Sequence, residues 1–211
     1  MPKSLSEPIS HASLPPIVEE LARRDPDLAR IATRYGIPPL WDREPGFPTL
    51  VLLILEQQVS LASARAVFER LCAATGSLVP ERLLLLDEDG LRAIGFSRQK
   101  AGYVRGMAHA IMEGRFDPHT LSEMEDKAAR AELIKLKGIG PWTADVYLLM
   151  ALGRADVWPA GDLALQIAIQ EVKGLAARPA SSEMETLAEA WRPWRSVAAR
   201  LLWQHYLGRK A

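Results

Sequence analysis

Residues 136–162 read LKGIGPWTADVYLLMALGRADVWPAGD. This order predicts a short helix, a Gly-Ile-Gly turn, a second helix, and then an aspartate that opens a third. The two glycines allow positive φ and a close approach of a ligand to the backbone, and Pro141 suits the first position of a helix. The amides of the turn and the helix N-terminus then favour an anion such as phosphate. A plain connection between two helices is the alternative, because Gly-x-Gly turns are common.

The aspartate that closes this stretch has two interpretations. Asp162 precedes the apolar residues Leu163, Ala164 and Leu165, so it suits a helix N-cap, where an aspartate accepts backbone N–H bonds and favours the helix dipole. It also suits a reactive carboxylate that a cap position would hold rigidly at a cleft. The two interpretations are compatible, and both stay open at this point.

The rest of the chain shows helical periodicity and almost no strand signal. The predicted fold class is therefore all-α. We expect one compact helical domain, made of two helical subdomains around a cleft, since the length suits one substantial domain or two small ones. The predicted helices cover residues 15–34 with a break at Asp25-Pro26, 47–75 with an interruption at Glu56-Gln57-Gln58, 98–113, 127–136, 141–152, 163–172, 182–190 and 193–207.

Composition excludes several kinds of site and leaves the partner open. Cys72 is the single cysteine, which excludes an intramolecular disulfide and any all-cysteine zinc or iron–sulfur site made by this chain. The net charge of zero counts against a nucleic-acid partner. Two blocks, 91–112 and 190–211, contain basic but no acidic residues, which favours a nucleic-acid partner. They offset the net-charge argument only in part, because ordinary solvated helices also show basic faces.

The start of the chain and its apolar runs bear on location. Residues 1–14 are polar and lack the apolar region of a signal peptide, so we expect a disordered tail. The longest strongly apolar run, Leu50 to Leu55, is too short to span a bilayer. We therefore expect no membrane partner and, by default, a cytoplasmic location.

Motifs over roughly residues 25–207 resemble the 3-methyladenine DNA glycosylase II family of the helix-hairpin-helix (HhH-GPD) DNA glycosylase superfamily. The hairpin followed by Asp162 is the part most typical of the superfamily, and the block from Trp191 to Ser196 is the part most typical of the family. The motifs that carry the resemblance are Glu56-Gln57-Gln58-Val59-Ser60, Gly95-Phe96-Ser97 with Lys100, the hairpin Leu136 to Pro141, Asp162, and Trp191-Arg192-Pro193-Trp194-Arg195-Ser196.

This resemblance implies a helix-hairpin-helix DNA glycosylase domain over residues 15–211, without the N-terminal β-rich domain of longer members. The implied activity is to flip an alkylated base, above all a cationic methylated purine, out of double-stranded DNA and to hydrolyse its N-glycosidic bond in base excision repair. Asp162 would be catalytic, because a fixed carboxylate stabilises an oxocarbenium-like sugar and can orient the attacking water. A cationic base leaves readily, so the general acid of ordinary glycoside hydrolysis is not required.

Two departures from related enzymes narrow the implied chemistry. Bifunctional glycosylase/lyases of the superfamily carry a lysine two residues after the second hairpin glycine, where this chain has Trp142, which cannot form a Schiff base. The four-cysteine cluster of endonuclease III and its relatives is absent too. The resemblance therefore implies a monofunctional enzyme with no cofactor and no metal site, although a monovalent cation at the hairpin is left open.

The resemblance also implies which residues bind DNA and the flipped base. Trp142 and Trp203 match positions that line the base pocket, where an indole face attracts a cationic ring; core packing is the alternative. Gln58 would fill the gap that the flipped nucleotide leaves, unless it belongs to a solvated turn. Trp41 is left open, and the other tryptophans are expected to be structural. Phosphate contacts are expected from Lys137, Gly138, Gly140, Ser97 and Lys100.

The expected partner is therefore double-stranded DNA that contains damaged bases. We expect the protein to bind it as a monomer, in a cytoplasmic location of the bacterial type, associated with the nucleoid. Three other functions stay open. The chain could be a non-catalytic helix-hairpin-helix DNA-binding module, a glycosylase/lyase that uses Lys137, or a helical scaffold that binds no DNA.

Overall fold

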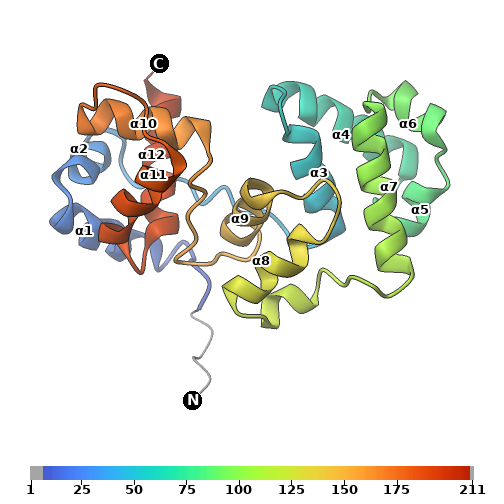
Figure 1. Cartoon of the computed structure of the whole chain (residues 1–211), viewed down its shortest axis with the longest axis horizontal. Helices are drawn as coiled ribbons and strands as arrows, with labels where there is room; N and C mark the ends of the chain where they lie inside the picture. The colour runs from blue at the N-terminus through green and yellow to red at the C-terminus, as the bar shows by residue number, and fades with distance from the viewer. Residues whose placement is uncertain (1–6, 210–211) are drawn as a thin grey trace. The chain divides into compact units, whose positions relative to one another are not determined.

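The computed structural model describes residues 7–209, which form twelve α-helices and two short 3-10 helices, with no strand in that range (Figure 1). The predicted all-α class is confirmed. The helices belong to two compact units: unit 1 holds the residues up to Asp42 and those from Leu148 onward, and unit 2 runs from Arg43 to Tyr147. No helix in the described range is long and apolar enough to cross a membrane.

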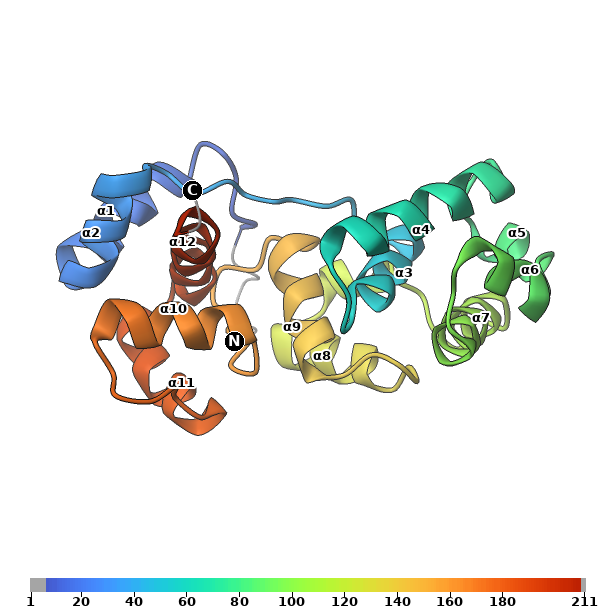
Figure 2. The same ribbon diagram turned by 90° about the horizontal axis from the view of Figure 1, so that it is seen from above.

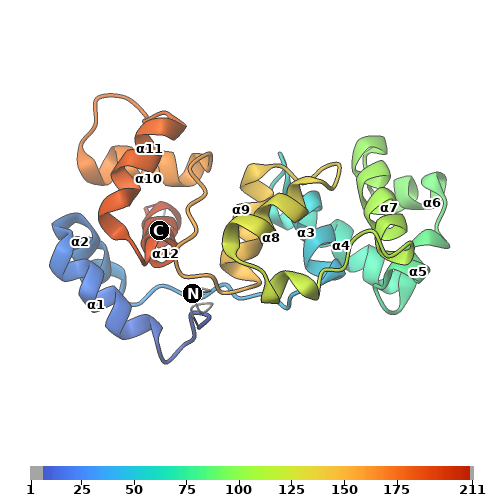
Figure 3. The same cartoon turned by 60° about the horizontal axis from the view of Figure 1, so that its bottom comes forward.

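Unit 1 is built around its last helix, α12, which packs against α1, α2 and α10. Within this unit α12 lies between the α1–α2 pair and the α10–α11 pair (Figures 2 and 3). All residues of α12 from Arg195 to Trp203 are buried, so this helix forms the core of the unit. The elements of unit 1 are α1 (Leu14–Arg24), α2 (Pro26–Tyr35), α10 (Leu163–Lys173), α11 (Ser181–Ala188), the 3-10 helix η2 (Glu189–Trp191) and α12 (Arg195–Gly208).

Unit 2 packs its apolar helix α3 against α4 and α7, and α7 also contacts α5 and α6. The two short helices α5 and α6 were not predicted, because five and seven residues are too few to show a helical period. The division between the units falls inside α9 (Pro141–Met150). The other elements of unit 2 are α3 (Phe47–Glu56), α4 (Leu61–Thr75), α5 (Pro80–Leu84), α6 (Glu88–Ile94), α7 (Arg98–Met112), the 3-10 helix η1 (Thr120–Glu123) and α8 (Asp126–Ile134).

Short side chains fix where several of these helices begin. The Ser60 hydroxyl accepts the N–H of Ser63 at the start of α4, and the Ser97 hydroxyl accepts the N–H of Lys100 at the start of α7. Each contact satisfies a backbone donor that has no partner inside the helix. Proline at the first helical position serves the same end in α2 and α9, since its missing N–H would have no partner there.

The predicted N-terminal tail of residues 1–14 falls partly outside the described residues, which begin at Glu7. Within the described part, Ile9 is buried and its N–H donates to the carbonyl of Gly153 at 2.8 Å. The Ser10 and Ser13 side chains then form a turn that leads into α1. Ile9 and Leu14 are therefore buried on unit 1, whereas residues 10–12 between them are exposed. The predicted tail of residues 1–14 stays a prediction.

Candidate functional site

Asp162 lies at the N-terminus of α10 in unit 1, with only 8 % of its surface exposed. Its Oδ1 accepts the backbone N–H of Leu165 at 2.9 Å, which makes it the cap of the helix. The same oxygen accepts the indole N–H of Trp203 in α12 at 3.1 Å. Two donors from two different helices therefore fix the direction of this carboxylate, so the cap and a rigidly held carboxylate coexist in one residue.

The Trp203 ring also contacts Trp41, which the sequence had left open. The two rings meet edge to face, with centroids 6.4 Å apart. Trp41 has a φ of +47°, a left-handed conformation that is rare for a bulky side chain and costs about 1–3 kcal/mol. Such conformations persist where the surroundings impose them and are common at functional sites. Unit 1 thus brings Asp162, Trp203 and Trp41 together.

Three other tryptophans of unit 1 make structural contacts, as predicted. The Trp191 indole N–H donates to the buried carboxylate of Asp25 at 2.8 Å, and that of Trp194 donates to Glu20 at 3.0 Å. Trp158 packs edge to face on Trp191. These contacts join α1 and the start of α2 to the segment that leads into α12.

The predicted hairpin between α8 and α9 is present in unit 2. Gly138 has a φ of +96°, and a Cβ at this residue would come within 2.4 Å of the Tyr103 ring. Ile139 is buried, and α9 begins at Pro141. Gly140 differs, because a Cβ there would meet no atom within 4 Å and its φ is not positive. Only Gly138 therefore needs the conformational freedom expected of both glycines.

A glutamine that sequence reasoning passed over is joined to this hairpin. The Gln57 side-chain amide donates to the carbonyl of Gly138 at 2.8 Å and to the hydroxyl of Thr143 at 3.0 Å. The next residue, Gln58, is exposed and has a φ of +57°. The amide of Gln57 thus ties the turn that presents Gln58 to the hairpin. The polar interruption at residues 56–58 was visible in the sequence, but its contact some 80 residues away was not.

Lys100, predicted to contact phosphate, has two acceptors within the protein. Its ammonium donates to the carbonyls of Leu55 and Gln57, at 2.7 Å each, and partial burial lowers its pKa from the ordinary value. These carbonyls belong to the last turn of α3 and to its C-cap residue Gln57, where a helix leaves carbonyls without intrahelical partners. Lys100 therefore holds the end of α3, and its phosphate contact stays a prediction. Ser97 caps α7, whereas Lys137 is exposed on the hairpin.

The remaining predicted residue, Trp142, lies in the first turn of α9 in unit 2 and is half-buried. The arginines of the block 190–211 are largely occupied within unit 1, because Arg192 and Arg195 pair with Asp156 and Arg209 pairs with Glu171. A lack of acidic residues along the sequence therefore did not mean a lack of acidic partners in space. In the described part of the chain no three His, Cys, Asp or Glu side chains gather as a metal site would require.

Comparison with known proteins gives a consistent set of relatives. Residues 51–195 match the family model described as HhH-GPD superfamily base excision DNA repair protein. A Bacillus subtilis protein named as a putative DNA-3-methyladenine glycosylase is 35 % identical over 159 residues, which are 72 % of this chain and 55 % of that protein. The DNA-3-methyladenine glycosylase 2 of Escherichia coli is 30 % identical, with the same two coverages.

Among solved structures, the 3-methyladenine DNA glycosylase of Schizosaccharomyces pombe in complex with abasic DNA matches with a TM-score of 0.84 at 26 % identity, over 90 % of this chain and 95 % of that one. A second Bacillus subtilis relative, named DNA-3-methyladenine glycosylase, is matched over 65 % of its length. The chain thus spans between about half and two thirds of these two Bacillus relatives.

Proposed function

The chain belongs to the HhH-GPD superfamily of base excision DNA repair proteins, and from this membership we propose that it is a monofunctional DNA glycosylase. It flips alkylated bases, above all cationic methylated purines, out of double-stranded DNA and hydrolyses their N-glycosidic bonds. The observation that carries the proposal is the fixed carboxylate of Asp162, held at the start of α10 by the N–H groups of Leu165 and Trp203.

In this proposal Asp162 acts on the sugar. Cleavage of the N-glycosidic bond leaves positive charge on the sugar ring, and a carboxylate already aimed at that charge stabilises it without reorganising. The same carboxylate orients the attacking water or takes its proton. A methylated purine carries its own positive charge, so it departs without protonation by a second carboxylic acid.

The nucleophile in this proposal is water. Trp142 stands where the lyases of the superfamily carry a lysine, and an indole has no amine with which to form a Schiff base. The nearest lysine along the chain, Lys137, is on the exposed hairpin and is assigned to DNA phosphate. The enzyme accordingly leaves an intact abasic site.

Aromatic residues supply the affinity for the base. In this proposal Trp142 and Trp203 each offer an indole face to the cationic purine, an attraction worth about 2 kcal/mol when water is excluded. Trp203 is well suited to this role because its N–H already faces Asp162. A ring at this place stacks on the base beside the carboxylate that acts on its sugar.

The α8–α9 hairpin grips the DNA backbone. Its backbone amides and Lys137 take the phosphate, and the open space beside Gly140 leaves room for it. Gln58, exposed at the tip of its turn, enters the duplex in place of the flipped nucleotide. Ser97 is a further phosphate contact at the start of α7.

The proposal is tested by replacing Asp162 with asparagine, which keeps the helix cap. Asp162→Asn is expected to lower the single-turnover release of 3-methyladenine from methylated duplex DNA by about 10³-fold. Binding to a duplex with an abasic-site analogue should stay within about twofold, because phosphate contacts dominate DNA affinity. Unchanged base release would reject Asp162 as the catalytic residue. DNA binding without base release by the wild type would leave a non-catalytic DNA-binding module as the function. A covalent adduct trapped by borohydride would instead indicate a lyase.

A further inference from the structure

The loop between α9 and α10, which leads to Asp162, is buried although it has no regular secondary structure. Ala155, Val157 and Trp158 are each at most 6 % exposed. Backbone groups buried in such a loop need hydrogen-bond partners from elsewhere in the protein. Those partners come from the start of α12, about 40 residues further along the chain.

Ser196 forms the first half of this attachment. Its backbone N–H donates to the carbonyl of Ala155 at 3.0 Å. Its hydroxyl accepts the N–H of Val157 and donates to the carbonyl of the same residue, both at 3.0 Å. Ser196 is 1 % exposed, so water does not compete for these contacts. The loop is thus paired with α12 through three hydrogen bonds.

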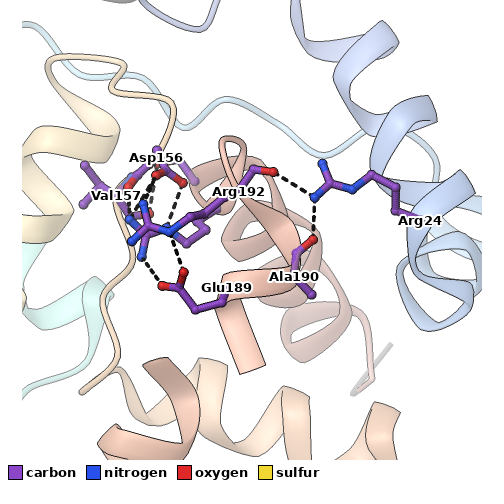
Figure 4. Close-up of polar contacts among 8 residues, drawn as sticks. Arg24, Asp156, Val157, Glu189, Ala190 and Arg192 are labelled. Atoms are coloured by element: carbon purple, nitrogen blue, oxygen red, sulfur yellow. Dashed lines mark hydrogen bonds and ion pairs between the residues drawn. The ribbon is translucent and has the colours of Figure 1, made fainter. Parts of the chain in front are cut away.

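Two arginines that grip one carboxylate form the second half. Arg195 donates from Nε to Asp156 Oδ1 at 2.7 Å and from Nη2 to the backbone carbonyl of Asp156 at 2.7 Å. Arg192 reaches the other carboxylate oxygen at 2.5 Å. Figure 4 shows Arg192 between Asp156 and Glu189, while Arg24 reaches the carbonyls of Ala190 and Arg192 from α1. The segment around η2 is therefore bound to the loop through Asp156 and to α1 through Arg24.

The same helix reaches Asp162 directly. Trp203, whose indole N–H binds Asp162 Oδ1, lies two turns after Ser196, about 10 Å along the helix axis. The loop from Ala155 to Asp162 is consequently fastened to α12 at both of its ends. Because α12 is a continuous buried helix, the two attachment points keep a fixed separation.

We propose that Asp156, Arg195 and Ser196 form a latch that, through α12, sets the orientation of the Asp162 carboxylate. Asp156 and Arg195 are then positioning residues, which never touch the DNA base. This inference rests on the proposed function, in which Asp162 is catalytic. A carboxylate displaced by about 1 Å loses up to about a hundredfold in rate, so the latch matters for turnover although it lies outside the site.

The first test measures base release. Arg195→Gln and Asp156→Asn are expected to slow the single-turnover release of 3-methyladenine at saturating enzyme by about tenfold to a hundredfold, well below the melting temperature. Affinity for a duplex with an abasic-site analogue should stay within about twofold. Arg209→Gln is the matched control, because it removes an ion pair between the residue that follows α12 and Glu171 of α10. This ion pair does not touch the loop, so the release rate should equal that of the wild type.

Coupling separates positioning from a general loss of structure. Arg195→Gln combined with Trp203→Phe should cost less than the product of the two single effects, since both changes disturb the same carboxylate. Effects that multiply, or release rates of Arg195→Gln and Asp156→Asn that match the wild type, would overturn the latch. If Asp162→Asn also releases bases at the normal rate, the catalytic role of Asp162 in the proposed function fails instead.

A readout that needs no activity covers that last case. The indole ¹⁵N–H resonance of Trp203, assigned as the one lost in Trp203→Phe, reports its hydrogen bond to Asp162. Arg195→Gln should shift this resonance and Arg209→Gln should leave it in place. An unshifted resonance in Arg195→Gln would reject the latch whether or not the protein releases bases.

Discussion

The hairpin of residues 136–140 and the loop of residues 153–162 are both short connections beside α9, yet they are held in different ways. The hairpin takes its shape from its own residues, the φ of Gly138 and the proline that begins α9, with Tyr103 and Gln57 closing in on it. The loop takes its shape from side chains of α12, about 40 residues away. A turn built on a positive φ and a proline can be specified largely by its own residues, whereas a carboxylate held in one direction by two helices needs distant supports.

The strongest way to break the hairpin is Gly138→Ala. The new Cβ would lie 2.4 Å from the Tyr103 ring at a φ of +96°, so the overlap and the left-handed backbone together should cost about 4 kcal/mol of unfolding free energy. Urea denaturation followed by circular dichroism measures it. Gly140→Ala is the control: it should keep the stability of the wild type but weaken binding to an abasic duplex. Equal stabilities of the two variants would contradict the local explanation.

The supports of unit 1 are tested by Asp25→Asn. Asp25 accepts both the Lys173 ammonium and the Trp191 indole, at 2.8 Å each, so breaking this buried pair should cost about 3 kcal/mol. Circular dichroism in urea at neutral pH checks this value. Asp27→Asn removes the more exposed partner of Lys173 and should cost less stability. A larger loss in Asp27→Asn than in Asp25→Asn would show that Asp27, not Asp25, is the main support.

The pH dependence of the same pair follows from its pKa values. Burial alone would raise the pKa of Asp25, but hydrogen bonds from Lys173 and Trp191 outweigh it and hold the pKa below the ordinary 3.8. Stabilisation from a depressed carboxyl pKa is present above the ordinary value and is lost as the pH falls through the folded-state value. The stability gap between wild type and Asp25→Asn should therefore stay constant near neutral pH and shrink below pH 3.8. A gap that widens in acid would contradict the pairing.

A smaller effect should come from Trp203→Phe, which keeps an aromatic ring and removes the N–H that binds Asp162. Hydrogen bonds to charged groups contribute about 1.5–3 kcal/mol, so base release should slow by about tenfold or more in single-turnover assays. Trp194→Phe is matched to it, because it removes an indole N–H bonded to Glu20 at 3.0 Å. The two variants should lose similar stability, but only the first should lose rate.

The smallest effect should come from Lys137→Gln on the exposed hairpin. Stability should change by less than about 0.5 kcal/mol, while the salt dependence of binding to an abasic duplex should become shallower by about one phosphate contact. Lys100→Gln is the contrasting variant, because the Lys100 ammonium holds the end of α3. This variant should lower the stability and leave the salt dependence of binding unchanged. The reverse pattern would restore Lys100 as the phosphate contact.

These regions also show what the sequence could predict. The helices of at least eight residues, the hairpin and the Asp162 cap were predictable, because caps, glycines and apolar periods act within a few residues of each other. The partners of Lys100 were not predictable, because they are carbonyls at the end of another helix. The latch stayed hidden for the same reason, since counting charges along the chain separates Arg195 from Asp156, its partner 39 residues away.

The bond between the Gln57 amide and the Gly138 carbonyl has a mechanical consequence. It makes the turn that presents Gln58 and the hairpin parts of one clip, whose span is set before any DNA arrives. In the proposed function the hairpin binds a phosphate while the turn places Gln58 against the base stack. The distance between these two contacts is fixed by the protein. An intact base pair resists insertion of Gln58, whereas a weakened base pair opens and admits it.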